Sequence, residues 1–468
     1  MRFLTLTLLL LVISVQAFAQ TTLISDELSL RRYENYRIIG KHGSEVLVTK
    51  YRQNKIEIYG FDADMKISWF KELDFDGKRV TFLDVISNQE GFALVYAARQ
   101  SKRTSVILTQ YNAQAEALNS AVLQTYDKRL YDVKPSILLS SDKQRLAIME
   151  LEEKNHLKLS TYDITKGEVQ WYRNLDIDAL IKGRDFSQAV LDNEGQVYLV
   201  FEGGNSRRHI RYHKFNVLRV SADDIVEHTI DLHGKLTYDV TFIYDEVNRR
   251  LVGTGLYDTE RMNRARGAFY TAVDYTQQSA GLVRFQTFDE DFMKVLVGRK
   301  NRRRTFDNSS IQKVMLRRDG GALMVVERQR ATMRPVGAGV SVSEAHRMDY
   351  YFDDIILVAF HPDGRMHWRE VLYKRQFSQD DGGQYSSFCV VQSPDRLRIL
   401  YNDEISRQSS VSQYVVETEG RPRRLSVMEP EDTDRLQLCF RSAQQVSGRE
   451  VIVPSKRRSR LQLVKLAY

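Results

Sequence analysis

The segment YDITKGEVQWYRNL, residues 162–175, shows the local pattern from which the fold is derived. A strand-like run ends in a polar turn that contains Gly167, and a second strand-like run carrying Trp171 follows. The segments FDADMKISWFKEL (61–73) and FHPDGRMHWREVL (360–372) have nearly the same order of residue types. Three copies of one hairpin in a single chain indicate a repeat.

A second pattern, a polar turn followed by a short apolar run, recurs along the chain, as in SSDKQRLAIME (140–150) and RRDGGALMVVE (317–327). The residues that precede these runs are Ser44, Gly91, Arg145, Gln196, Arg250, Gly321, Arg396 and Arg449. Successive members of this set lie 47, 54, 51, 54, 71, 75 and 53 residues apart. Each unit reads as four short strands, and four-stranded units of this length are typical of propeller blades.

The two ends of the chain predict how the ring closes. After the eighth turn only one more strand fits, RLQLVKLAY (460–468), so the last blade lacks its outer strand. The segment TTLISDELSL (21–30) is a spare strand that supplies it. We therefore predict an all-β chain, an eight-bladed β-propeller closed by the N-terminal strand, and seven blades with one atypical unit is the alternative. Helical periodicity over a dozen residues is hard to find after residue 20.

The three tryptophans, Trp69, Trp171 and Trp368, occupy the same position in the predicted outermost strand of three blades. A large flat side chain at that position packs between neighbouring blades and buries an apolar area worth roughly a few kcal/mol. We predict a structural role for all three.

The first residues, MRFLTLTLLLLVISVQAFAQ, combine Arg2, a short apolar run and a small-x-small site at Ala17–Ala19. This pattern predicts a cleaved signal peptide over 1–19, followed by a single propeller domain over 20–468. We expect a periplasmic or extracellular protein that does not span a membrane. Cys389 and Cys439 are interpreted as buried core residues, and a disulfide between them stays open as an alternative.

The segment 162–175 also resembles the repeat of quinoprotein-type eight-bladed propellers. Asp163, Thr165, Gly167 and Trp171 match its acidic residue, its Thr/Lys-Gly turn and its docking tryptophan. The resemblance implies a propeller from a superfamily that includes quinone-dependent dehydrogenases and non-enzymatic assembly scaffolds of the outer membrane. The adjacent cysteine pair of many such cofactor sites is absent here, which disfavours the dehydrogenases, and we predict no cofactor.

Three long insertions, 202–215, 257–278 with the blade link 298–309, and 327–354, are predicted to open on one face of blades four, five and six. Arginine presents a planar fork that suits carboxylate, sulfate or phosphate, so these segments predict an anion-binding surface. Its candidate residues are Arg207, Arg208, Arg211, Arg261, Arg264, Arg266, Arg302, Arg303, Arg304, Arg328, Arg330 and Arg334. The alternative is that these arginines are solvated loop residues. A smaller basic group, Lys456, Arg457, Arg458 and Arg460, follows in blade eight.

No catalytic signature stands out. His209 and His213 lie four apart, but that spacing binds a metal only on a helix and this segment reads as loop into strand, so we predict no metal. The chain lacks a Gly-x-Ser-x-Gly elbow and a phosphate-binding glycine loop. The net charge of +8 favours an anionic partner, while the predicted export argues against nucleic acid.

The composition, 42% hydrophobic and 28% charged residues, is that of a globular chain. The leading hypothesis is a non-enzymatic propeller of the cell envelope or exterior that binds a protein or an anionic glycan through the arginine-rich face. The alternative is a hydrolase or lyase that acts on acidic polysaccharide at the mouth of the central channel, with Tyr270, Tyr351, Asp353 and His346 as the residues to test.

Overall fold

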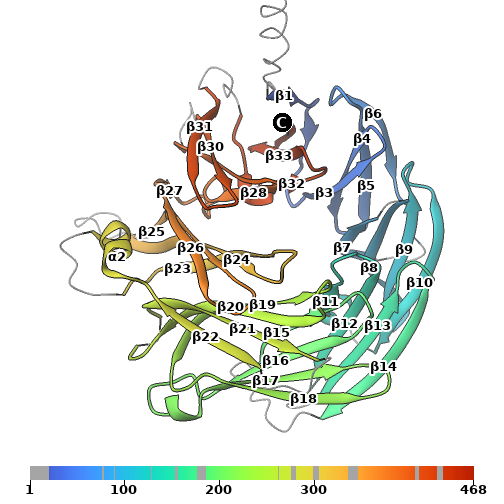
Figure 1. Cartoon of the computed structure of the whole chain (residues 1–468). Coiled ribbons are helices and arrows are strands. Elements are labelled where there is room, and N and C mark those ends of the chain that lie inside the picture. The colour runs from blue at the N-terminus through green and yellow to red at the C-terminus, as the bar shows by residue number, and fades with distance from the viewer. Residues whose placement is uncertain are drawn as a thin grey trace, which may run out of the picture.

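Eight antiparallel four-stranded sheets, two of them with an additional strand, follow one another around a ring (Figure 1). The computed structural model describes residues 20–75, 79–88, 90–127, 129–152, 156–176, 186–261, 263–275, 281–298, 305–335, 346–405, 410–429 and 436–468. The predicted eight-bladed β-propeller is confirmed, and the seven-bladed alternative is wrong. The predicted signal peptide, 1–19, lies outside the described residues.

The first four blades are built from consecutive strands. Blade 1 contains β3 (Asn35–His42), β4 (Glu45–Arg52), β5 (Lys55–Phe61) and β6 (Ile67–Glu72). Blade 2 contains β7 (Arg79–Ser87), β8 (Gly91–Gln100), β9 (Arg103–Asn112) and β10 (Ala117–Tyr126). Blade 3 contains β11 (Ser136–Leu139), β12 (Arg145–Glu152), β13 (His156–Asp163) and β14 (Glu168–Asp176). Blade 4 contains β15 (Phe186–Leu191), β16 (Val197–Gly203), β17 (Lys214–Val220) and β18 (Ile225–Asp231).

The last four blades complete the ring. Blade 5 contains β19 (Leu236–Asp245), β20 (Arg250–Asp258), β21 (Gly267–Asp274) and β22 (Leu282–Thr287). Blade 6 contains β23 (Ser309–Leu316), β24 (Ala322–Pro335), β25 (His346–Phe360) and β26 (Met366–Leu372), and β27 (Gln376–Gln379) pairs with β25. Blade 7 contains β28 (Phe388–Gln392), β29 (Arg396–Asn402), β30 (Val411–Glu417) and β31 (Pro422–Met428). Blade 8 contains β32 (Gln444–Gln445), β33 (Glu450–Arg457), β34 (Arg460–Ala467), β1 (Thr21–Ile24) and β2 (Leu28–Ser29).

The hydrophobic core lies between neighbouring blades. The second strand of a blade is apolar along its length because adjacent blades cover both of its faces, and in β8 every residue from Gly91 to Ala98 is buried. One core cluster joins Leu47 of blade 1 to Phe92 of blade 2. The fourth strands are largely exposed, and β10 leaves its first four residues open to solvent. Burial thus falls from the inner strands of a blade to its outer strand, and this explains why the apolar runs of the second strands mark the repeat so clearly.

The N-terminal strand closes the ring, as predicted. β1 pairs with β34 in an antiparallel ladder that sets Thr21 opposite Ala467. The backbone N–H of Ser25 donates to the carbonyl of Leu463 at 2.8 Å, and the N–H of Leu463 donates to Oγ of Ser25 at 2.8 Å. The last blade is therefore assembled from the two ends of the chain.

The three tryptophans lie in the outermost strands β6, β14 and β26, as predicted, and pack against the cores between two blades. Trp171 Nε1 donates to the carbonyl of Gly195 in blade 4 at 3.0 Å. Trp368 Nε1 donates to the carbonyl of Thr418 in blade 7 at 3.0 Å. Their predicted structural role is confirmed.

One helix departs from the predicted all-strand pattern. α2 (Glu290–Val297) lies in the link between blades 5 and 6, with Asp289 as its N-cap and Phe292, Met293 and Leu296 buried. Eight residues are too few for a helical period to stand out over a dozen positions, so the sequence analysis missed it. Short 3₁₀ turns, η1 (Leu130–Asp132), η2 (Ile210–Tyr212) and η3 (Phe440–Ser442), complete the element list of the described residues.

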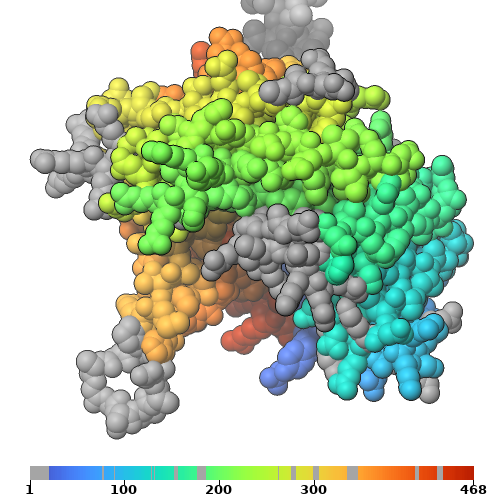
Figure 2. Space-filling view, turned by 90° about the horizontal axis from the view of Figure 1, so that it is seen from below, coloured from blue at the N-terminus to red at the C-terminus, as the bar shows by residue number. Residues whose placement is uncertain are grey.

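The insertion 327–354 is a hairpin arm rather than a long loop. β24 and β25 pair beyond the blade, from Gln329 opposite Phe352 to Pro335 opposite His346, and β27 adds a third strand. The arm, drawn in orange, projects from the ring in Figure 2. Its tip, 336–345, lies outside the described residues.

A buried ion pair fixes the base of this arm. Lys374 Nζ lies 2.8 Å from Oε1 of Glu327, and neither side chain has any exposed area. Oε2 of Glu327 accepts a hydrogen bond from Ser387 Oγ at 2.7 Å, and Lys374 Nζ also donates to Gln376 Oε1 at 2.9 Å. Burial outweighs the attraction of Glu327 and lowers the pKa of Lys374. These bonds satisfy both charges where β24 meets the link to blade 7.

The two cysteines are buried and both are free thiols, so the interpretation as core residues is confirmed. Burial raises the pKa of Cys389 to about 12, which keeps its thiol protonated. In the described part of the chain, no helix has the length and apolar character needed to cross a membrane.

Candidate functional site

The β16–β17 loop of blade 4 carries Arg207, Arg208 and Arg211, and all three side chains are exposed. A buried network at the foot of the loop fixes it. Glu202 Oε1 lies 3.1 Å from Nε2 of His213, whose Nδ1 lies 2.5 Å from the carbonyl of Lys235. The loop therefore presents its three arginines from a defined base.

The β20–β21 loop of blade 5 carries Arg261, Arg264 and Arg266. The backbone N–H of Ala265 donates to the carbonyl of Phe306 at 2.7 Å, and Phe306 returns a bond of 3.0 Å, so the loop is joined to the link that leads into blade 6. Arg264 and Arg328 line a small cavity of about 200 Å³ beside this bridge, together with Asp307. Both loops connect the second and third strands of their blades and open on the predicted face.

The structure divides the predicted arginines into two groups. Arg266, Arg328 and Arg334 form ion pairs with Asp258, Asp354 and Asp349, and Arg330 stacks over the ring of Tyr351 at 4.2 Å. Within the described residues the other five form no ion pair, and we call them the rim arginines. They are Arg207, Arg208, Arg211, Arg261 and Arg264. Arg302, Arg303 and Arg304 lie outside the described residues.

The aromatic residues of the insertions serve mainly as packing. Tyr270 has no exposed area, and its hydroxyl donates to the carbonyl of Gly320 at 3.0 Å. Phe352 is buried at the base of the arm. The predicted insertion 257–278 is wrong beyond Arg266, because Gly267–Asp274 form β21 and Tyr275 lies at the β21–β22 turn. Its ring contacts Tyr198 with a centroid separation of 5.3 Å.

The residues named for the enzymatic alternative do not form one site. Tyr270 is buried in the interior of blade 5, whereas Tyr351, Asp353 and His346 lie on β25 of the arm. None of these four residues lines the central cavity described below. The hydrolase or lyase alternative is therefore left without the catalytic residues that were named for it.

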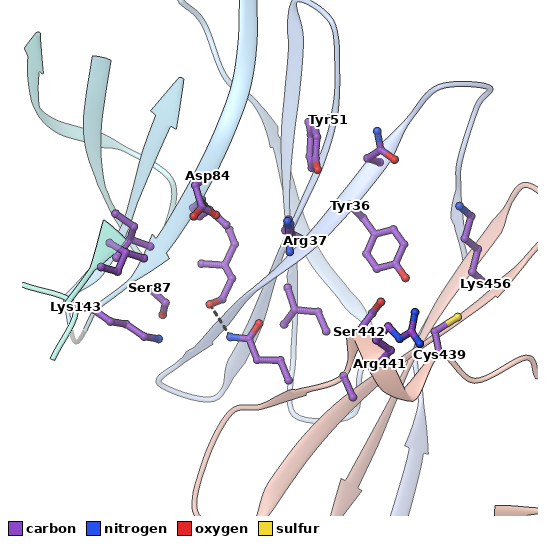
Figure 3. Close-up of a pocket in the computed structure, with 18 of the residues that line it drawn as sticks. Tyr36, Arg37, Tyr51, Asp84, Ser87, Lys143, Cys439, Arg441, Ser442 and Lys456 are labelled. Atoms are coloured by element: carbon purple, nitrogen blue, oxygen red, sulfur yellow. Dashed lines mark hydrogen bonds between the residues drawn. The ribbon is translucent and has the colours of Figure 1, made fainter. Parts of the chain in front are cut away.

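A cavity of about 560 Å³ lies on the inner side of the ring, where blades 7, 8, 1, 2 and 3 face the centre (Figure 3). Its wall includes residues 35–39 of β3, residues 84–87 of β7 and residues 441–444 around η3. Four cationic side chains line it, Arg37, Lys143, Arg441 and Lys456. Asp84 is the single carboxylate among the described residues of the lining, so this lining is basic.

Hydrogen bonds and stacking hold the walls of this cavity. Gln444 Nε2 donates to the carbonyl of Ile39 at 3.2 Å and joins blade 8 to blade 1. Ser87 Oγ lies 3.2 Å from Nε2 of His42, and Tyr51 stacks on Phe82 with a centroid separation of 4.0 Å. Burial, and secondly the charge of Lys143, lower the pKa of His42. The Ser87–His42 pair has no carboxylate bonded to the other ring nitrogen within the described residues, so it lacks the third member of a catalytic triad.

Most of this cavity was not predicted from the sequence. Lys456 was named within a basic group of blade 8, but Arg37, Lys143 and Arg441 were not. The available signal was Arg37 itself, a charged residue within the innermost strand of blade 1, where neighbouring Ile38 and Ile39 are buried.

No group of three or more metal-ligating side chains comes together among the residues that the structure describes. Both ring nitrogens of His213 already face partners, the carboxylate of Glu202 and the carbonyl of Lys235. His213 therefore holds the base of the loop.

No protein-family model and no curated protein matches the chain. Among solved structures, the uncharacterized protein lmo1340 from Listeria monocytogenes EGD-e has 7% identity and a TM-score of 0.40, over 80% of this chain and 88% of that one. The Nup133 β-propeller domain of Vanderwaltozyma polyspora has 11% identity and a TM-score of 0.40, over 96% and 97%. The β-propeller domain of the Trilobed protease from Pyrococcus furiosus has 11% identity and a TM-score of 0.36, over 83% and 95%. The fold described above rests on the strand pairing, because likenesses at this level carry no argument.

Proposed function

We propose that this protein is a non-enzymatic binding scaffold that holds an anionic partner, a protein with an acidic surface or an acidic glycan, against the rim arginines of blades 4 and 5. The observation that carries the proposal is the set of five arginines on two neighbouring loops, unpaired among the described residues. Guanidinium groups that are already paired, such as those of Arg266 and Arg334, have less to offer a ligand.

Contacts at the bases of the two loops support this function. The Glu202–His213 network and the Ala265–Phe306 bridge hold the loop bases in place. A partner then has less conformational entropy to remove on binding, which favours affinity. Carboxylate, sulfate and phosphate groups are the natural ligands of such arginines.

A binding experiment on the chain from Gln20 to Tyr468 tests the proposal. The immobilised protein is exposed to extract and culture medium of the source cells and to an array of acidic glycans, and each retained ligand is purified and titrated. We expect a variant with Arg207, Arg208 and Arg211 all replaced by Ser to bind at least about tenfold more weakly, and affinity to fall as salt rises.

The matched control is Arg249→Ser. Arg249 is an exposed arginine at the β19–β20 turn of blade 5, on the opposite face, where it forms a surface ion pair with Glu194 at 3.5 Å. Its replacement leaves binding unchanged if the rim arginines are the site. Equal losses in the control and the triple variant, or an affinity that is independent of salt, would contradict the proposal.

We further propose that residues 1–19 direct export and are cleaved, so that the protein acts in the periplasm or outside the cell. N-terminal sequencing of the protein purified from its source then begins at Gln20. A chain that retains Met1 or Arg2 would refute the cleavage.

A further inference from the structure

We infer that the central cavity is a second binding site, separate from the rim arginines, and that its ligand is a small acidic sugar with at least two anionic groups. This site does not depend on the proposed function of the rim. Four cationic side chains line this one cavity.

The cations lie on separate parts of the wall. Lys143 comes from the β11–β12 turn of blade 3, Arg37 from the inner strand of blade 1, and Arg441 and Lys456 from blade 8. Figure 3 shows Lys143 on one side, Arg441 and Lys456 on the other, and Arg37 between them. A single small anion reaches one of these positions at a time, whereas an elongated ligand with two anionic groups reaches both ends.

The described residues do not balance the charge of the cavity. Among those that line it, Asp84 is the one carboxylate, and its Oδ1 accepts a hydrogen bond from the N–H of Val85 at 2.9 Å. None of the four cations forms an ion pair with another described residue. Like charges within one cavity repel each other, and a bound polyanion removes that repulsion while it gains charge-assisted hydrogen bonds.

Part of the remaining lining can form hydrogen bonds with the hydroxyl groups of a ligand. Tyr36, Tyr51, Ser87 and Ser442 bring hydroxyls, and Asn35, Gln384 and Gln444 bring amides. A volume of about 560 Å³ is within the range of cavities that hold small organic ligands. Polar donors and acceptors around a basic centre match a polyhydroxylated acid, and apolar lining residues such as Ile39, Val85 and Leu139 can contact its carbon skeleton.

Contacts within the protein hold one side of the cavity, which contains Lys456 and Arg441. Lys456 is held at its backbone carbonyl by Tyr385 Oη at 2.9 Å, and Arg441 lies over the ring of Phe352 at 4.9 Å. Together with the Gln444–Ile39 bond these contacts hold the side of the cavity on which Arg441 and Lys456 lie, which lowers the entropic cost of binding there.

Isothermal titration with defined probes tests the inference. Digalacturonate supplies two carboxylates, and a hexose 1,6-bisphosphate supplies two phosphates. Maltose and inorganic phosphate serve as controls for the neutral sugar and the single anion. We expect at least one of the two dianionic probes to bind and both controls to bind at least about tenfold more weakly. Binding of digalacturonate alone identifies carboxylates as the recognised groups, and binding of the bisphosphate alone identifies phosphates.

Variants locate the site. We expect Arg37→Gln and Lys143→Gln each to lower the affinity for the probe about tenfold, because each variant removes one charge-assisted contact. Both side chains are exposed to the cavity and form no bond with another described residue, so both variants are expected to keep the wild-type thermal midpoint. The triple replacement of Arg207, Arg208 and Arg211 by Ser leaves probe binding unchanged, which separates this site from the rim.

Three results would overturn the inference. They are the absence of binding by both dianionic probes, binding of maltose as tight as that of digalacturonate, and loss of probe binding in the rim variant but not in Arg37→Gln or Lys143→Gln. The rim proposal survives each of these results, since its own ligand is measured with different variants.

Discussion

Glu246 is an acidic side chain at the β19–β20 turn whose surroundings disfavour its charge. Its Oε1 accepts a hydrogen bond from the backbone N–H of Asn193 at 3.0 Å. Burial, with added repulsion from Asp192, Asp142 and Glu194, raises the pKa of Glu246 from 4.5 to about 7. Carboxylates from the turns of three successive blades thus meet on the face opposite the rim arginines.

This raised pKa predicts the sign of a pH effect on stability. The folded state holds the proton of Glu246 more tightly than the unfolded chain does. Protonation of Glu246 therefore contributes its full share to the free energy of unfolding below pH 4.5, and this share is lost as pH rises through about 7. Glu246→Gln removes that loss. We expect the variant to gain about 1 kcal/mol over the wild type between pH 5 and pH 8, a value reduced for the solvent screening of a half-buried group.

Urea unfolding at both pH values measures this difference. The control is Glu90→Gln, an exposed carboxylate in the corresponding turn of blade 2. If the Glu246→Gln variant differs from the wild type by the same amount at pH 5 and pH 8, the raised pKa is excluded.

At the scale of elements, one tryptophan packs the fourth strand against the core shared with the next blade in each of blades 1, 3 and 6. Trp171→Ala opens the contact between β14 and blade 4, and we expect it to lower the free energy of unfolding by about 2 kcal/mol, less than for a fully buried tryptophan because the ring is half-exposed. Trp171→Phe keeps most of the ring and loses the bond to the carbonyl of Gly195, at a cost of about 1 kcal/mol.

Denaturant unfolding checks this order of stability. Tyr172→Ala is the matched control, because the next residue of the same strand is 50% exposed and points away from the interface. If Tyr172→Ala lowers the free energy of unfolding as much as Trp171→Ala does, the loss comes from any truncation in this strand and not from the contact between the blades.

The elements differ in how far the sequence determines them. Each second strand is covered on both faces and therefore carries an unbroken apolar run, which made the eight turns and the closing strand predictable. The arm was not, since Gln329–Pro335 and His346–Phe352 contain no long unbroken apolar run, and their described partners are each other and β27. α2 is shorter than the window over which a helical period becomes visible.

The candidate sites show a similar division. The rim arginines stand out because each group lies within one loop of the sequence. The pairing of Arg328 with Asp354, or of Arg334 with Asp349, depends on the register of β24 against β25, which no local pattern reveals. Arg37, Lys143 and Arg441 meet only because the ring brings blades 1, 3 and 8 around one cavity.

At the scale of the whole molecule, the ring depends on the segment 20–30. Removing it takes away β1 and β2, together with the buried side chains of Leu28 and Leu30. We expect a loss of about 4 kcal/mol from these two leucines, and self-association because the freed edge of β34 exposes unpaired backbone groups.

Unfolding midpoints and light scattering measure the two effects. The control is a chain that lacks only residues 1–19, which keeps β1 and is expected to remain monomeric and fully stable. Should the longer truncation prove equally stable and monomeric, the closing ladder would have no part in holding the ring.

The closing ladder also sets an order of events in time. Ser25 and Leu463, which exchange hydrogen bonds, are 438 residues apart in the sequence. During synthesis the first strand is made long before its partner, and it stays single until the last ten or so residues have been added. Joining the ends of so long a chain costs roughly 5 kcal/mol of entropy, which the finished blades reduce by bringing the ends together. A premature stop shortly before residue 460 would therefore leave the opposite end of the chain without a partner, and the defect would appear at both termini at once.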